Sequence, residues 1–288
     1  PASRKDKRDL LISESDTNGA TDGDLVQAMP LPAQGRGPLR GRVNEILGRI
    51  EDPRAASLLA IAAHDIPTEF PPAVIEQARA ATPSKAPRED LRSLNLITID
   101  PADARDHDDA VYAETTKEGW RVIVAIADVA AYVTPGTPLD KEALNRGNST
   151  YFPDRVVPML PFELSADACS LKQGEDRFCM AVEMFIDKHG HKQRHRFFRA
   201  VMQSSAGLSY EEAQTAIDGQ PSARAEPLLE PVLRPLWAAY DALSKARDKR
   251  GPLDLDLPER KVEFADDGTI KGIITKDRFD AHRLIEEM

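Results

Sequence analysis

Thr98-Ile99-Asp100-Pro101-Ala102-Asp103-Ala104-Arg105-Asp106-His107-Asp108-Asp109-Ala110 is the stretch on which the interpretation of this chain depends. Five carboxylates fall within ten residues here, directly after the apolar run 94–99. A second apolar run, 110–113, follows the acids. A strand on either side with the acids between places the acids at a sheet edge or turn, where several of them can converge on one point.

Carboxylates that lie so close together raise each other's proton affinity unless a cation neutralises them. A hard cation suits an all-oxygen cluster, and magnesium favours a few carboxylates together with waters and substrate phosphates. The stretch therefore predicts a magnesium-dependent phosphoryl-transfer site.

Three alternatives compete with the magnesium site. A solvated acidic turn is common for acid clusters, but here hydrophobic strands flank the acids and no Lys or Gly separates them. A calcium loop needs Gly at its sixth position, where a frame from Asp106 has Val111. An aspartyl-phosphate phosphatase would use Asp106-x-Asp108, but that motif ends in Thr or Val where this chain has Ala110.

The composition of the 288 residues suits one large or two modest domains. A net charge of −10 argues against a uniformly basic surface for nucleic acid but leaves room for a local basic groove. Cys169 and Cys179 are expected to be reduced and buried. We find no signal peptide and no membrane-spanning run, so we expect a cytoplasmic protein without a membrane partner. The chain begins at Pro1 and stops within a predicted helix, which indicates a fragment.

The residues before 52 read as short strands separated by glycine turns, typical of part of a small β-barrel. The predicted strands are 10–13, 24–29 and 41–47. Arg36, Arg40 and Arg42 would give the barrel a phosphate-facing edge. No aromatic residue precedes Phe70, so a structural barrel is favoured over a base-stacking one.

The rest of the chain alternates helices with strands and hairpins, which predicts an α+β fold with a mixed sheet. Helices are expected at 55–63, 72–81, 138–146, 228–249 and from 280, and strands at 120–129, 178–186, 194–204, 261–264 and 269–274. Ser209 to Glu212 is a capping box. Loop residue Tyr151 would stack on a nucleobase or fill the core, and the pattern alone slightly favours the core.

Several motifs in this chain resemble, in the same order, those of the ribonuclease II / ribonuclease R exoribonucleases. They are 98–100, 103–106, 108–111, 125–129, 151–153, 157–161, 164–171 and 280–287. The segments 157–161 and 250–259 resemble ribonuclease R more than ribonuclease II. The resemblance implies a partial cold-shock (OB-like) domain at 1–51, a helical connector and linker at 52–88, and at 89–288 the N-terminal part of an RNB catalytic domain, incomplete at its C-terminus.

The same resemblance implies processive 3′→5′ hydrolysis of single-stranded RNA to nucleoside 5′-monophosphates. It places the metal centre on Asp100, Asp106, Asp108 and Asp109, with Mg²⁺ as the cofactor and Mn²⁺ able to replace it. Within that centre Asp108 is the acid whose loss stops cleavage, and Asp103 is a bystander. Tyr151 matches the family tyrosine that packs against the 3′-terminal nucleotides.

The implied partner is single-stranded RNA with a free 3′ end, and the full-length enzyme is expected to be a monomer. The family's nuclease domain continues past the Ile-Glu-Glu motif that ends this chain. A non-catalytic product that binds RNA or a partner is therefore the alternative to a working exoribonuclease.

Overall fold

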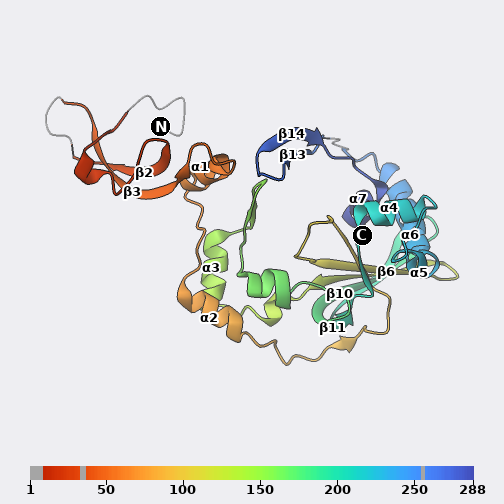
Figure 1. The fold of residues 1–288 in the computed structure, drawn as a ribbon. Coiled ribbons are helices and arrows are strands. Elements are labelled where there is room, and N and C mark those ends of the chain that lie inside the picture. Colours follow the sequence, from red (N-terminus) through yellow and green to blue (C-terminus); the bar gives the residue numbers. More distant parts are fainter. Residues whose placement is uncertain (1–8, 33–36, 254–256) are drawn as a thin grey trace. The chain divides into compact units, whose positions relative to one another are not determined.

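The computed structural model describes residues 9–32, 37–253 and 257–288, and the chain forms two compact units (Figure 1). The first unit comprises residues 1–70, 146–159 and 258–276, and the second comprises 71–145, 160–257 and 277–288. Helices and strands occur in both, which confirms the predicted α+β class. Arg36 of the predicted phosphate-facing edge lies outside the described residues, as does part of the segment 250–259.

The first unit contains the predicted N-terminal sheet. Its strands are β1 (Leu11–Ile12), β2 (Asp24–Pro30) and β3 (Arg40–Arg49), in the order β1-β3-β2, and a 3₁₀ turn, η1 (Glu14–Asp16), follows β1. β3 pairs in parallel with β1 and antiparallel with β2. Arg40 donates to the Ser13 hydroxyl over 2.6 Å, and Arg42 pairs with Asp16 over 2.7 Å. Both predicted phosphate-facing arginines thus have partners within their own unit, and their phosphate role stays a prediction.

Three further pieces complete the first unit. They are the helix α1 (Ala55–Ala63), the short pair β8 (Thr150–Tyr151) and β9 (Val156–Val157), and the hairpin β13 (Arg260–Phe264) and β14 (Ile270–Thr275). The hairpin turns at Gly268, whose φ of +81° is a conformation that favours glycine. Helix α1 has the predicted bounds. Its segment is helical because alanine and leucine are strong helix formers.

A seven-stranded mixed sheet organises the second unit, in the order β12-β5-β6-β7-β10-β11-β4. The strands are β4 (Glu89–Asp90), β5 (Ile97–Asp100), β6 (Asp109–Thr115), β7 (Gly119–Ala127), β10 (Asp176–Asp187), β11 (Lys192–Gln203) and β12 (Ala206–Ser209). The pairs β12/β5 and β11/β4 are parallel, and the other neighbours are antiparallel. The predicted mixed sheet is confirmed.

The long hairpin β10–β11 turns at Gly190, as predicted. The φ of Gly190 is +81°, and a Cβ there would lie 2.1 Å from the carbonyl oxygen of Ala242. Glycine is therefore required both for the backbone conformation and for the close approach of a helix.

The helices of the second unit are α2 (Pro72–Ala80), α3 (Pro138–Arg146, whose last residue joins the first unit), α4 (Tyr210–Ile217), α5 (Glu226–Leu228), α6 (Arg234–Asp248) and α7 (Asp280–Glu287). A 3₁₀ turn, η2 (Val129–Ala131), and two π-helical turns, η3 (Leu164–Ala168) and η4 (Leu229–Leu233), accompany them. The interruption predicted in the helix at 228–249 is confirmed, since Pro231 lies in η4 and Pro235 at the start of α6. In the described residues every helix is too short or too polar to cross a bilayer.

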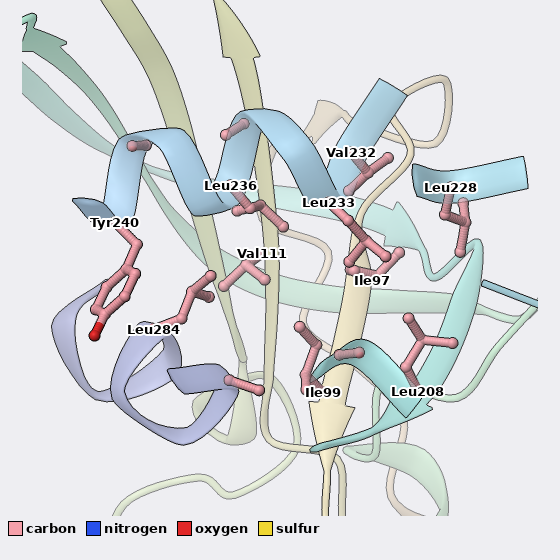
Figure 2. Close-up of a cluster of buried hydrophobic side chains, with 14 of the residues drawn as sticks. Ile97, Ile99, Val111, Leu208, Leu228, Val232, Leu233, Leu236, Tyr240 and Leu284 are labelled. Carbon is pink, nitrogen blue, oxygen red and sulfur yellow. The ribbon is translucent and has the colours of Figure 1, made fainter. Parts of the chain in front are cut away.

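The core of the second unit lies between the sheet and the helices α6 and α7. Figure 2 shows Leu233 and Leu236 on the helical side, with Ile97 of β5 and Val111 of β6 on the sheet side. All four are fully buried, and each such side chain contributes about 1.5–3 kcal/mol. Leu284 of α7 closes the cluster. This packing holds β5 and β6 together and thereby fixes the end of the sheet that carries the acids.

Candidate active site

The acidic stretch connects two neighbouring antiparallel strands. Asp100 is the last residue of β5 and Asp109 the first of β6, and Ile97 pairs with Val111. Because the strands run in opposite directions, both acids come to the same end of the sheet. Asp106 and Asp108 lie in the connection between them. The predicted arrangement, strands on either side and acids at the turn, is confirmed.

Ser170 fixes the conformation of the acid loop. This serine is fully buried, and its hydroxyl accepts from the His107 amide over 3.0 Å and donates to the Arg105 carbonyl over 2.9 Å. The Leu171 amide adds a 2.8 Å hydrogen bond to the His107 carbonyl. On the other flank, the Ala127 amide donates to the carbonyl of Asp108 over 2.9 Å. The loop is thus anchored through the backbone of Arg105, His107 and Asp108.

The acids influence one another electrostatically. Burial, together with Asp100 and Asp108, raises the pKa of Asp109 to about 6. The side chain of Asp108 reaches the surface, but partial burial and the charges of Asp106 and Asp100 raise its pKa as well. Carboxylates that hold protons this tightly mark a site that a cation would stabilise.

His107 is the one basic side chain that contacts Asp100 among the contacts described. Its Nδ1 lies 2.7 Å from Asp100 Oδ2, and this hydrogen bond is the main cause of a raised pKa for His107, with Asp106 and Asp108 adding to it. The raised pKa of His107 favours a positively charged imidazole beside the acids.

In the described part of the chain, no three His, Cys, Asp or Glu side chains are arranged as a metal-binding group. The donor set itself suits a hard divalent cation, because it consists of carboxylate oxygens. Burial, followed by the charges of the neighbouring acids, raises the pKa of Asp108 and of Asp109. The residues therefore fit such an ion chemically. His107 contacts Oδ2 of Asp100, so this carboxylate has a second oxygen with which to bind a cation. The magnesium centre on Asp100, Asp106, Asp108 and Asp109 stays a prediction.

Tyr151 lies in β8 of the first unit, whereas the acids belong to the second. Its side chain is 66% exposed, so the slight preference for a core-filling tyrosine was wrong. The reason is local: β8 has two residues and, among the described strands, pairs only with β9, so the residue is not covered by its own sheet. Its contact with RNA stays a prediction.

Tyr210 is a neighbour of the acids that the sequence pattern did not single out. Ser209 pairs with Asp100 in parallel register, and its capping box with Glu212 starts α4 at Tyr210. The Tyr210 ring stacks on His282 at 3.9 Å between centroids. Burial, followed by the charges of Asp109, Asp100 and Glu286, raises the pKa of Tyr210 to about 12, so its hydroxyl stays neutral beside the acids.

Sequence reasoning missed the roles of His107, Ser170 and Tyr210, although each lay inside a motif that it quoted. His107 interrupts the acids, Ser170 belongs to 164–171, and Tyr210 follows the capping serine. A signal for His107 was available, since it is the only ionisable base between Asp106 and Asp109. Ser170 and Tyr210 carry no local signal, because their contacts join segments far apart in the chain.

Comparison with known proteins identifies two families in this chain. The RNB domain matches residues 88–288, and the cold shock domain matches residues 1–71. The second match agrees with the OB-like barrel predicted for the N-terminal strands. The acids, Ser170, Tyr210 and Tyr151 all fall within the RNB match.

The curated relatives of this chain include ribonucleases R. That of Vibrio cholerae serotype O1 is 43% identical over 289 residues, which is 97% of this chain and 35% of the relative. That of Escherichia coli K12 is 41% identical over 289 residues, with the same coverage of each chain. This chain therefore spans about a third of the length of these relatives.

Two solved structures extend the comparison. Mycoplasma genitalium RNase R in complex with double-stranded RNA superposes with a TM-score of 0.91 at 25% identity, covering 98% of this chain and 51% of that one. Yeast Ssd1, described as a pseudonuclease, shares the fold with a TM-score of 0.64 at 15% identity, covering 92% of this chain and 34% of that one. The same fold is therefore found in proteins with and without nuclease activity.

Proposed function

The chain belongs to the RNB-domain family, and we propose that it carries the catalytic acids of a 3′→5′ exoribonuclease that releases nucleoside 5′-monophosphates from single-stranded RNA. The observation that carries the proposal is the gathering of Asp100, Asp106, Asp108 and Asp109 at one end of the sheet. The raised pKa values of Asp108 and Asp109, caused by burial and by their acidic neighbours, support a site built for divalent cations. Ribonuclease R relatives at about two-fifths identity support the class of reaction.

In this proposal Asp100, Asp106 and Asp109 hold magnesium, with Mn²⁺ able to replace it, and Asp108 completes the centre as the acid whose loss stops cleavage. If these acids held magnesium, the ion would supply a lowered pKa for the attacking water and positive charge beside the leaving 3′-oxygen. Ser170 keeps the acid loop in position through the His107 amide.

Tyr151 and Tyr210 have different roles in this proposal. Tyr151 exposes 66% of its side chain and offers a ring on which a 3′-terminal base stacks. Tyr210 keeps a neutral hydroxyl next to Asp100 and Asp109, and its ring is held by His282. The partner is RNA with a free 3′ end, bound by a monomeric, cytoplasmic protein.

A non-catalytic protein that binds RNA or a partner is the second candidate function. It is supported by the length of the chain, which spans 35% of its ribonuclease R relatives, and by the fold shared with the pseudonuclease Ssd1. Retention of all four acids favours the catalytic candidate.

Two variants of the acid loop test the proposal. Asp108→Asn should abolish magnesium-dependent release of nucleoside 5′-monophosphates while leaving the Kd for single-stranded RNA unchanged, because it removes a charge at the cation site and no RNA contact. Asp103→Asn is the matched control in the same loop and should keep both properties. Near-wild-type release by Asp108→Asn would refute the role of Asp108. No release by the wild-type chain, with RNA still bound, would favour the non-catalytic candidate.

A further inference from the structure

A cavity of about 470 Å³ opens beside the acid cluster in the second unit. Its wall includes Thr98, Asp100, His107, Lys172, Gly207 and Arg224. It shares Asp100 and His107 with the acid site, whereas Asp106, Asp108 and Asp109 are not part of its lining. The volume lies within the roughly 300–1,000 Å³ typical of small-molecule sites.

The cavity contains a buried hydroxyl for which the described residues offer no partner. Thr98 is 1% exposed, and its Oγ1 makes no hydrogen bond within the part of the chain that the structure describes. Native structures rarely leave such a group unsatisfied, and when they do, a ligand, ion or water commonly completes it. An unpaired donor in the wall of a cavity therefore indicates that something polar binds there.

Gly207 keeps this hydroxyl accessible. It pairs with Thr98 in the parallel register of β12 and β5. Its backbone is not in the left-handed region, so glycine is not needed for conformation. A Cβ at this position would lie 3.3 Å from Thr98 Oγ1 and would fill the space in front of it. The missing side chain thus leaves room in the cavity.

Two cationic side chains supply donors to the same cavity. Lys172 is bound to Asp167 over 2.6 Å, which leaves two of its three N–H donors for a ligand. Arg224 donates to the Gly207 carbonyl and lies 3.9 Å from Glu212, a distance too long for a hydrogen bond. A guanidinium has five donors, so several remain for a phosphate group.

We propose that this cavity binds a nucleoside 5′-monophosphate, with the phosphate on Lys172, Arg224 and the Thr98 hydroxyl. The choice of ligand rests on the proposed function, since a mononucleotide is the product formed at the adjoining acids. The cavity is larger than an inorganic phosphate needs, and the small residues Ala102 and Ala104 in its wall leave space for the nucleoside. A product held there would slow the release step and inhibit the enzyme.

The test is a calorimetric titration of AMP into the 288-residue chain, in EDTA and without RNA, so that binding is measured apart from catalysis. Wild type should bind AMP saturably and more tightly than it binds adenosine or inorganic phosphate. Thr98→Val, which deletes the hydroxyl at constant shape, should raise the Kd about tenfold, equivalent to about 1.4 kcal/mol. Arg224→Gln should weaken binding at least as much, and Gly207→Ala should weaken it by narrowing the cavity.

Arg234→Gln is the matched control. Arg234 has the same side-chain exposure as Arg224, 56%, and is likewise paired with a glutamate, but it lies on α6 away from the cavity lining. Its Kd for AMP should equal that of wild type. Thr98→Val should also melt at the same or a higher temperature than wild type without ligand, because it removes a buried unsatisfied group.

Absence of saturable AMP binding would overturn the inference, as would wild-type affinity in Thr98→Val and Arg224→Gln. Inorganic phosphate that binds as tightly as AMP would overturn the nucleotide assignment. A chain that degrades RNA but does not bind AMP contradicts this inference alone. A chain that binds AMP through Thr98 and Arg224 but releases nothing from RNA contradicts the proposed function instead.

Discussion

Replacing Ser170 by alanine should disturb the acid loop without touching an acid. The Ser170 hydroxyl satisfies the His107 amide over 3.0 Å and the Arg105 carbonyl over 2.9 Å, and the serine is fully buried. In Ser170→Ala the His107 amide loses its partner, which costs about 1–3 kcal/mol for a buried donor. Arg105 is exposed, so water can solvate its carbonyl and this loss adds little. We expect a loss of about 2 kcal/mol in the free energy of unfolding.

The catalytic effect should exceed what the loss of stability explains. His107 lies between Asp106 and Asp108, and a displacement of about 1 Å in such groups can lower a rate about a hundredfold. Urea unfolding followed by circular dichroism measures the first effect, and single-turnover release of nucleoside 5′-monophosphates measures the second.

Ser204→Ala is the control for this experiment. Ser204 is 1% exposed, and its hydroxyl donates to the Ala206 carbonyl over 3.0 Å, a hydrogen bond that does not involve the acid loop. It should lose about 1 kcal/mol of stability and keep its rate. A Ser170→Ala protein with less than about 0.5 kcal/mol of destabilisation, or with the rate of Ser204→Ala, would refute the assignment of Ser170 as the anchor of the loop.

Three further predictions concern single side chains. Asp109 has a folded pKa of about 6, above its ordinary 3.8, so its contribution to stability is present below pH 3.8 and lost as the pH rises through 6. In metal-free protein the free energy of unfolding of wild type, relative to that of Asp109→Asn, should therefore fall between pH 3.8 and 6. A difference that does not change with pH would contradict the raised pKa. Tyr151→Ala should raise the Kd for RNA by about tenfold or more without lowering Tm, since stacking contributes about 1–3 kcal/mol per base. The control is Phe162→Ala, because Phe162 is also an exposed aromatic, at 57%. Equal increases in Kd for the two variants would argue against stacking on Tyr151. Arg88→Ala should lower the free energy of unfolding by about 3–5 kcal/mol, because among the described residues it leaves the buried carboxylate of Asp128 with only the 3.4 Å contact to Arg199. Chemical unfolding measures this loss, and a loss no larger than that of Arg92→Ala at the surface would contradict it.

The parts of the fold that depend on residues close together in the sequence were predictable. The helix 55–63, the capping box at Ser209, the turn at Gly190 and the hairpin around Gly268 follow from propensity, capping and glycine patterns, which act over a few residues. The strands on either side of the acids belong to the same class, because their apolar runs are continuous.

The parts that join distant segments were not predictable. The placement of β12 beside β5, which brings Tyr210 near Asp100, pairs residues more than a hundred positions apart. The contact of Ser170 with the acid loop spans 63 residues. The sequence pattern predicts no helical turn at η3, since a π-helical turn has no sequence pattern distinct from other short helical turns. The exposure of Tyr151 depends on what packs around a two-residue strand.

Asp128 shows that a residue within a motif shared with a family can have a structural role and not a catalytic one. It belongs to the motif 125–129 that the family shares, yet it is 5% exposed and paired with Arg88 over 2.7 Å. Arg88 also lies over the Phe178 ring, 4.1 Å from its centroid. The presence of Asp128 in this motif is explained by its buried ion pair at the end of β7, without a catalytic role.

The most direct test of the central claim is the identity and order of the products made from a 5′-labelled single-stranded RNA by the 288-residue chain. With Mg²⁺, mass spectrometry should find nucleoside 5′-monophosphates, and the label should stay on a strand that shortens from its 3′ end; EDTA should stop both. Label released first as a mononucleotide, internal cleavage, or products carrying a 3′-phosphate would contradict the account, as would no cleavage at all.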